Sequence, residues 1–221
     1  MKTQITMLLV VGMIVALAGT ATADTITFQE GVNGYTHDAT TLREHDQRDL
    51  NGDAWDNMYL GSYFDTHSRA LMDFDLSSLG AAGMIQIDSI TLTVTQYTNA
   101  DASINKNITY ALYETTTDWV SSEATWNNRL VPDYDNFPDV GTAWDAGTYT
   151  DIKTGDTYAG GGDYGPEISN FVTNPTDLDE GETFTWGSTA AFVTAAQNAF
   201  DDDGHLELLA ADTNTAATSG L

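Results

Sequence analysis

Apolar and polar side chains alternate along residues 69–76. One face would carry Ala70, Met72, Phe74 and Leu76, and the other, mostly polar face would carry Arg69, Leu71, Asp73 and Asp75. Because successive side chains of a strand point to opposite faces, this period of two predicts a β-strand with one buried face. Residues 85–97 also predict a strand, because Ile85, Ile87, Ile90, Leu92 and Val94 recur among polar residues and Thr91, Thr93 and Thr95 take the opposite face. A break in the period near Asp88-Ser89 predicts a β-bulge there.

Other short segments have strand character, and one has the spacing of an amphipathic helix. The predicted helix covers residues 190–200, where Phe192, Ala195, Ala196, Ala199 and Phe200 recur at helical spacing. The further predicted strands are residues 25–29, 57–63, 107–114, 183–186 and 205–211. Many short strands and Gly-rich turns predict an all-β fold, an antiparallel β-sandwich of jelly-roll type with one short helix near the C-terminus.

The first 23 residues have the pattern of a signal peptide. Lys2 precedes an uncharged apolar run, and Ala21-Thr22-Ala23 matches the small-x-small cleavage pattern. The run covers about 15 residues, fewer than the roughly 20 that a membrane-spanning helix needs. We therefore expect a signal peptide over residues 1–23 and a single β-sandwich domain over residues 24–221, secreted to the extracellular space or the periplasm.

Charge and composition exclude several classes of protein. The chain has 33 acidic and 7 basic side chains, a formal net charge of −26, which opposes binding of nucleic acid phosphates. The absence of cysteine excludes disulfides, a thiol nucleophile and cysteine-ligated zinc. No serine nucleophile elbow, P-loop or dinucleotide-binding glycine pattern occurs. A pair of carboxylates that could hydrolyse a glycoside carries little information in a chain with 33 acidic side chains. Without a catalytic motif, the sequence predicts a protein that is not an enzyme.

The order of motifs resembles the DNRLRE domain, also called disaggregatase-related. The segment from Arg69 to Leu79 contains Phe74-Asp75-Leu76-Ser77, and Thr117-Asp118-Trp119 is followed by Thr125-Trp126-Asn127. The resemblance implies a module similar to carbohydrate-binding modules of secreted polysaccharide-degrading proteins. Members of that family usually continue into a last strand, whereas this sequence ends at Leu221, so we expect either a truncated product or a sheet with an open edge. A missing last strand would leave an open edge through which copies of the chain self-associate.

Aromatic residues in the turn-rich segment 115–165 are candidates for stacking on sugar rings. For Trp119 and Trp126 two interpretations stay open, a sugar-stacking platform and a small core that pins the long loop, and the family resemblance favours the core. Loop aromatics that are exposed are better ligand candidates. The predicted carbohydrate-binding residues are Trp144, Tyr158, Tyr164 and Tyr134.

One acidic segment has features of a calcium loop. Asp49, Asn51, Asp53 and Asp56 place oxygen ligands at near-alternate positions around Gly52. Hard cations such as Ca²⁺ prefer clustered carboxylate and carbonyl oxygens. The segment lacks the distant bidentate glutamate of a complete loop, and a solvated acidic turn is the alternative interpretation.

The leading functional hypothesis is a secreted, non-catalytic module that binds polysaccharide or belongs to a cell-surface matrix. A strongly anionic protein repels acidic glycans, so the expected partner is a neutral polysaccharide or an acidic one bridged by calcium. A structural or adhesive extracellular protein stabilised by calcium, without a specific glycan, is the alternative. A polysaccharide lyase or hydrolase is the third hypothesis.

Overall fold

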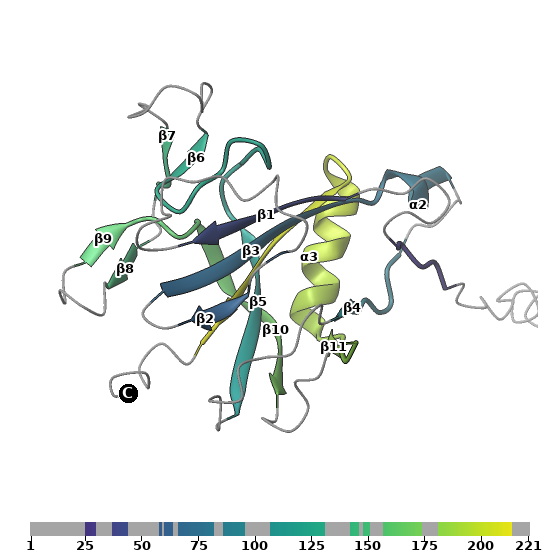
Figure 1. Ribbon diagram of the computed structural model, residues 1–221. Coiled ribbons are helices and arrows are strands. Elements are labelled where there is room, and N and C mark those ends of the chain that lie inside the picture. Colours follow the sequence, from purple (N-terminus) through teal and green to yellow (C-terminus); the bar gives the residue numbers. More distant parts are fainter. Residues whose placement is uncertain are drawn as a thin grey trace, which may run out of the picture.

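The computed structural model describes residues 25–29, 37–43, 58, 60–63, 66–81, 86–95, 107–130, 142–145, 148–150, 157–173 and 181–213. This part of the chain consists mostly of β-strands in antiparallel sheets, together with two short helices (Figure 1). The predicted all-β antiparallel class is therefore confirmed and agrees with a sandwich. The jelly-roll connectivity stays a prediction.

The largest sheet in the described residues has six strands. Its order is β1-β3-β12-β5-β10, and β2 also pairs with β3. The strands are β1 (Asp38–Arg43), β2 (Gly61–Tyr63), β3 (Thr66–Asp75), β5 (Ile108–Thr115), β10 (Tyr164–Thr173) and β12 (His205–Asp212). All neighbours are antiparallel. The last described strand, β12, thus occupies the middle of the sheet, and the ends of the order are β1 and β10.

Three strand pairs and two helices surround this sheet. The pairs are β4 (Leu92–Thr95) with β11 (Thr183–Trp186), β6 (Asn128–Leu130) with β7 (Thr142–Ala143), and β8 (Thr148–Thr150) with β9 (Thr157–Ala159). The helices are α2 (Ser77–Ala81) and α3 (Ala190–Asp201).

One face of the six-stranded sheet packs against α3 and the β4–β11 pair. Alternation along β3 directs Ala70 and Met72 into this core, where they join Leu208 and Phe192. The Nε1 group of Trp186 donates a hydrogen bond of 3.1 Å to the Tyr110 carbonyl, which fixes β11 against β5. The predicted apolar side of residues 69–76 is therefore the side that faces the helix.

The opposite face of the sheet carries a second core, built around tryptophans. Leu71 of β3 and Leu209 of β12 point to this side, because each is one residue away from the side chains that face α3. The segment 117–126 covers them with Trp119 and Trp126. Both faces of β3 are consequently buried, although its sequence alternates.

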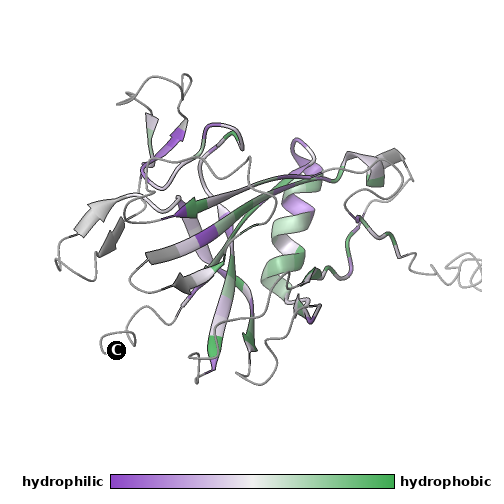
Figure 2. Cartoon of the chain, in the orientation of Figure 1, coloured by the Kyte–Doolittle hydropathy of each residue, from purple (hydrophilic) through white to green (hydrophobic). Residues whose placement is uncertain are grey.

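Helix α3 begins and ends at recognisable capping residues. Thr189 is the N-cap, and its side chain accepts a hydrogen bond of 3.0 Å from the Phe192 N–H group. The Thr189 hydroxyl also donates to the Ile168 carbonyl of β10. After Asp201 the chain turns at Gly204, which has a φ of 88°. Figure 2 shows most of α3 in white to green and the turn after it in purple.

Replacing Thr189 with alanine should lower the free energy of unfolding by about 1 kcal/mol, because the substitution removes the cap and leaves the Ile168 carbonyl without this donor. Urea unfolding followed by circular dichroism measures the change. Thr194→Ala, on the exposed side of the same helix, should leave stability unchanged or slightly higher. Equal losses in the two variants would contradict the capping role.

Several predicted elements differ from the structure. Residues 25–29 form no strand, although Phe28 packs against the first core. Residues 86–91 also lie outside any strand, so the predicted bulge at Asp88-Ser89 is wrong. The Ile87 N–H donates to the Gln197 side chain and the Ile90 N–H to Ser188, and these bonds replace a strand ladder. Helix α2 was not expected from the sequence pattern.

Candidate functional site

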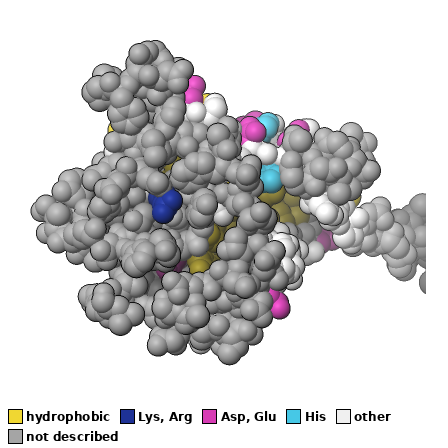
Figure 3. Space-filling view, viewed as in Figure 1, with side chains coloured by type: hydrophobic (Ala, Val, Ile, Leu, Met, Phe, Trp, Pro, Cys, Tyr) yellow, Lys and Arg dark blue, Asp and Glu magenta, His cyan; other side chains and the backbone are white. Residues whose placement is uncertain are grey.

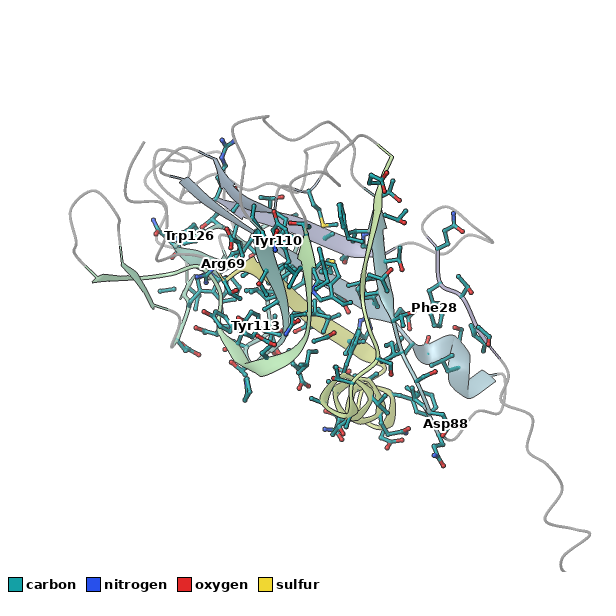
Figure 4. All side chains as sticks on the ribbon, turned by 90° about the horizontal axis from the view of Figure 1, so that it is seen from below. Phe28, Arg69, Asp88, Tyr110, Tyr113 and Trp126 are labelled. Carbon is teal, nitrogen blue, oxygen red and sulfur yellow. The ribbon has the colours of Figure 1, made fainter. Side chains whose placement is uncertain are left out.

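Four side chains gather on the face of the sheet that lies away from α3, and we call them the aromatic–arginine cluster: Arg69, Tyr113, Trp126 and Tyr164. The Arg69 guanidinium carbon lies 5.0 Å from the centre of the Trp126 ring and 5.4 Å from that of Tyr164. The Tyr113 and Tyr164 ring centres are 4.7 Å apart. Figure 4 shows Arg69 beside Trp126, with Tyr113 in the same part of the molecule. These distances are within the range of cation–π and aromatic contacts.

A glycine segment holds this cluster in place. The Arg69 Nη1 group donates to the Gly161 carbonyl at 2.5 Å, and the Gly161 N–H donates to the Trp126 carbonyl at 2.6 Å. Gly160 has a φ of 137°, and a Cβ there would lie 2.5 Å from the Trp126 carbonyl oxygen. Only glycine fits this approach without a shift of the neighbouring backbone. The segment is buried, not an exposed flexible loop.

A buried carboxylate joins three parts of the chain next to the glycine segment. Asp163 is 1% exposed, and its Oδ2 atom accepts hydrogen bonds from the Thr117 hydroxyl at 3.0 Å and from the Asp145 N–H at 2.5 Å. The Asp163 carbonyl accepts from the Thr116 N–H at 3.1 Å. Such bonds offset the cost of burying a charge. Asp163 therefore positions the loop that carries Trp119 and Trp126, and the sequence pattern did not identify it.

The predicted carbohydrate-binding residues differ in how far their side chains are exposed. Trp144 is only 3% exposed, belongs to the second core and donates to the Thr125 carbonyl at 3.0 Å, so the expectation of an exposed loop aromatic is wrong for it. Tyr164, at the start of β10, is 36% exposed. The backbone of Tyr158 belongs to β9, but the structure does not describe its side chain. Tyr134 lies outside the described residues. Tyr164 is thus the predicted contact with a visible exposed ring.

Trp119 and Trp126 resolve the choice that the sequence left open. Trp126 is fully buried and Trp119 is 7% exposed, and both belong to the second core. They pack as a core that pins the loop, which confirms the interpretation favoured by the family resemblance.

The predicted calcium loop, Asp49, Asn51, Asp53 and Asp56, lies outside the described residues. Within the described part of the chain, no group of three His, Asp or Glu side chains is arranged to hold a metal ion. Calcium binding therefore stays a prediction.

Acidic side chains of three neighbouring strands line up on the face that carries Arg69. The strand register places Asp38 of β1 opposite Asp73 of β3, and Asp73 opposite Glu207 of β12. We call these three residues the carboxylate row. His205 Nδ1 lies 2.9 Å from an Asp73 oxygen, and the Thr115 hydroxyl donates to Glu207 at 3.1 Å. Figure 3 shows cyan histidine atoms close to magenta acidic atoms on the face in view.

Two carboxyl groups of the row, Asp73 and Glu207, and the neighbouring His205 have raised pKa values. Burial is the main reason that the pKa of Glu207 is raised to about 7, and the nearby Asp73, Asp118 and Asp203 add to it. Burial also raises the pKa of Asp73, against the effect of its hydrogen bond with His205. That hydrogen bond is the main cause of the raised pKa of His205. Asp73, Glu207 and His205 therefore keep their protons to a higher pH in the folded chain than in the unfolded chain.

No family model and no curated protein matches the chain. Among the described helices, neither is long and apolar enough to cross a membrane.

Proposed function

We propose that the chain is a secreted, non-catalytic β-sandwich module that binds polysaccharide, with Tyr164 as its central contact. The observation that carries this proposal is the partly exposed Tyr164 ring, held by Tyr113 and Arg69 on a strand of the main sheet. Aromatic rings pack against the apolar C–H faces of sugar rings, and a rigid ring loses little conformational entropy on binding.

The remaining features support a glycan rather than another partner. The net charge of −26 opposes acidic polymers unless a cation bridges them, so a neutral glycan is favoured. The resemblance to DNRLRE domains and the signal-peptide pattern of residues 1–23 support the same extracellular role.

The first test is retention of the protein on a panel of immobilised neutral and acidic polysaccharides, with millimolar calcium and again with chelator. Retention on one glycan would establish a binding module, and a calcium requirement would show that a cation builds or bridges the site. A folded protein that no glycan retains would contradict the proposal and favour a structural or adhesive role.

Tyr164→Ala should reduce affinity for the retained glycan roughly tenfold, equivalent to about 1.4 kcal/mol, because it removes the stacking face. Tyr164→Phe keeps the ring and should bind almost as wild type. Val172→Ala is the matched control, because Val172 is 55% exposed on the same strand. Isothermal titration measures the three affinities, and unchanged binding by Tyr164→Ala would exclude this residue as the contact.

A further inference from the structure

Strand β10 is irregular in the segment that begins with Tyr164. Tyr164 pairs with Thr115 of β5, and three residues later Glu167 pairs with Tyr113, only two residues away on β5. In a regular strand, residues three positions apart point to opposite faces of the sheet. Residues that pair across two strands share a face, so the extra residue in β10 brings Glu167 to the face that carries Tyr164.

A second irregularity does the same for Asn170. The register of β10 shifts again between Glu167 and Ser169, and Asn170 lies opposite Ala111, which is two residues from the partner of Glu167. Tyr164, Glu167 and Asn170 therefore lie on one face, the face away from α3, and all three are exposed. We call these three residues the β10 strip. Bulges that re-aim side chains in this way are common beside functional sites.

The two polar members of the β10 strip hold each other in place. The Asn170 side-chain amide donates to one carboxylate oxygen of Glu167 at 2.5 Å and so orients this carboxylate. A carboxylate only accepts hydrogen bonds, so its second oxygen offers a ligand a negatively charged acceptor. Burial is the main reason that the pKa of Tyr113 is raised, and the neighbouring Tyr164 and Glu167 add to it, which agrees with a Glu167 carboxylate close to the tyrosine pair.

The nearby cation does not reverse the charge of the strip. The Arg69 Nη1 group donates to the Gly161 carbonyl, and the guanidinium lies against the rings of Trp126 and Tyr164. Glu167 is exposed, whereas Arg69 is partly buried. A sugar hydroxyl beside Glu167 gains a charge-assisted hydrogen bond, but a sugar carboxylate has no hydrogen to donate and is repelled.

We propose that Glu167 makes the Tyr164 site specific for neutral sugars: the glycan lies along β10, with one ring on Tyr164 and a hydroxyl of the next ring donating to Glu167. The inference rests on the proposed function and adds the residue that rejects uronic acids. By strand rise, the two side chains stand roughly 7–10 Å apart along the strand, so their contacts fall on successive rings. Asn170 is a positioning residue, because it acts through the orientation of Glu167.

The experiment uses pairs of sugars that differ only in charge. Linear hexasaccharides of glucose, mannose and galactose, and the uronate hexasaccharides of the same linkage, are titrated into the full chain by calorimetry, with chelator present to prevent bridging by calcium. The wild type should prefer the neutral member of a pair. Glu167→Gln should reduce this preference roughly tenfold, because the repulsion disappears while the amide oxygen still accepts from a hydroxyl.

Two further variants separate charge from position. Glu114→Gln removes the same charge from the neighbouring strand, but on the face toward α3, and should leave the preference unchanged. Asn170→Ala releases the Glu167 carboxylate and should weaken neutral binding several-fold while the preference persists, because the charge remains. Glu167 and Asn170 are exposed, so neither substitution opens the core.

The outcomes distinguish this inference from the proposed function. An unchanged preference in Glu167→Gln, an equal change in Glu114→Gln, or a wild type that prefers the uronate would each overturn the role of Glu167. In those cases, loss of binding in Tyr164→Ala would leave the polysaccharide-binding module standing. If the wild type binds none of the six hexasaccharides, the inference falls, and the polysaccharide panel tests the proposed function separately.

Discussion

Replacing Trp126 with alanine is expected to lower the free energy of unfolding by about 3–5 kcal/mol. The side chain is fully buried in the second core and packs under Arg69 and the glycine segment. Its removal leaves a cavity that Gly160 and Gly161 cannot fill, because they have no side chains. Urea unfolding monitored by circular dichroism would give the loss directly.

Two companion variants make this expectation specific. Trp126→Phe keeps an apolar ring and should lose markedly less stability. Val120→Ala, in the same loop but at a position 42% exposed, should change stability by less than about 0.5 kcal/mol. A loss below 1 kcal/mol for Trp126→Ala would mean that the loop is not part of the cooperative fold.

Stability should fall as the pH rises from 5 to 8, because the folded chain holds protons at the carboxylate row. The pKa of Glu207 rises from 4.5 in the unfolded chain to about 7, so folding is progressively opposed as this carboxyl ionises across that window. The raised pKa of His205 acts in the same direction, since its contribution is fully present below pH 6.5 and lost as the pH rises through the folded value. If Glu207 were fully buried, its pKa shift would correspond to a loss of roughly 3.4 kcal/mol in the free energy of unfolding. Because the group is half-buried and screened by solvent, we expect a loss of about 1–2 kcal/mol.

Glu207→Gln tests the source of this pH dependence. The amide keeps the size of the side chain and cannot ionise, so the variant should be more stable than wild type at pH 8 and similar at pH 5. Urea midpoints at both pH values measure the difference. Glu182→Gln removes an exposed charge elsewhere and should shift both midpoints equally. A wild-type pH slope in Glu207→Gln would assign the effect to other groups.

The fold class was predictable where side-chain alternation coincides with a strand partner. Residues 69–76 alternate and residues 205–211 are mostly apolar, and the two segments pair with each other in the centre of the sheet as β3 and β12. Residues 86–91 were also predicted to lie in a strand, but the Ile87 and Ile90 N–H groups bond to the Gln197 and Ser188 side chains instead. Propensity describes a suitable surface, and only tertiary pairing decides whether a strand forms.

The candidate site was predictable only in part, for a related reason. Tyr164 and Trp144 are both aromatic residues in a Gly-rich region, yet one is exposed and the other is in the core. Their difference depends on Asp163 and on Thr125, which bring distant segments together. Three successive glycines, Gly160 to Gly162, are a sequence signal of close backbone approach, but a glycine run is equally typical of an exposed turn. No sequence pattern predicts which distant groups will donate hydrogen bonds to a buried carboxylate such as Asp163.

The central place of β12 sets the order in which the sheet can assemble during synthesis. Asp73 and His205, which pair across β3 and β12, are 132 residues apart in the chain. Until residues 205–212 leave the ribosome, β3 and β5 have no strand between them, and each presents an unpaired edge. The nascent chain therefore cannot close its sheet early, and its folding rate depends on long-range contacts made last.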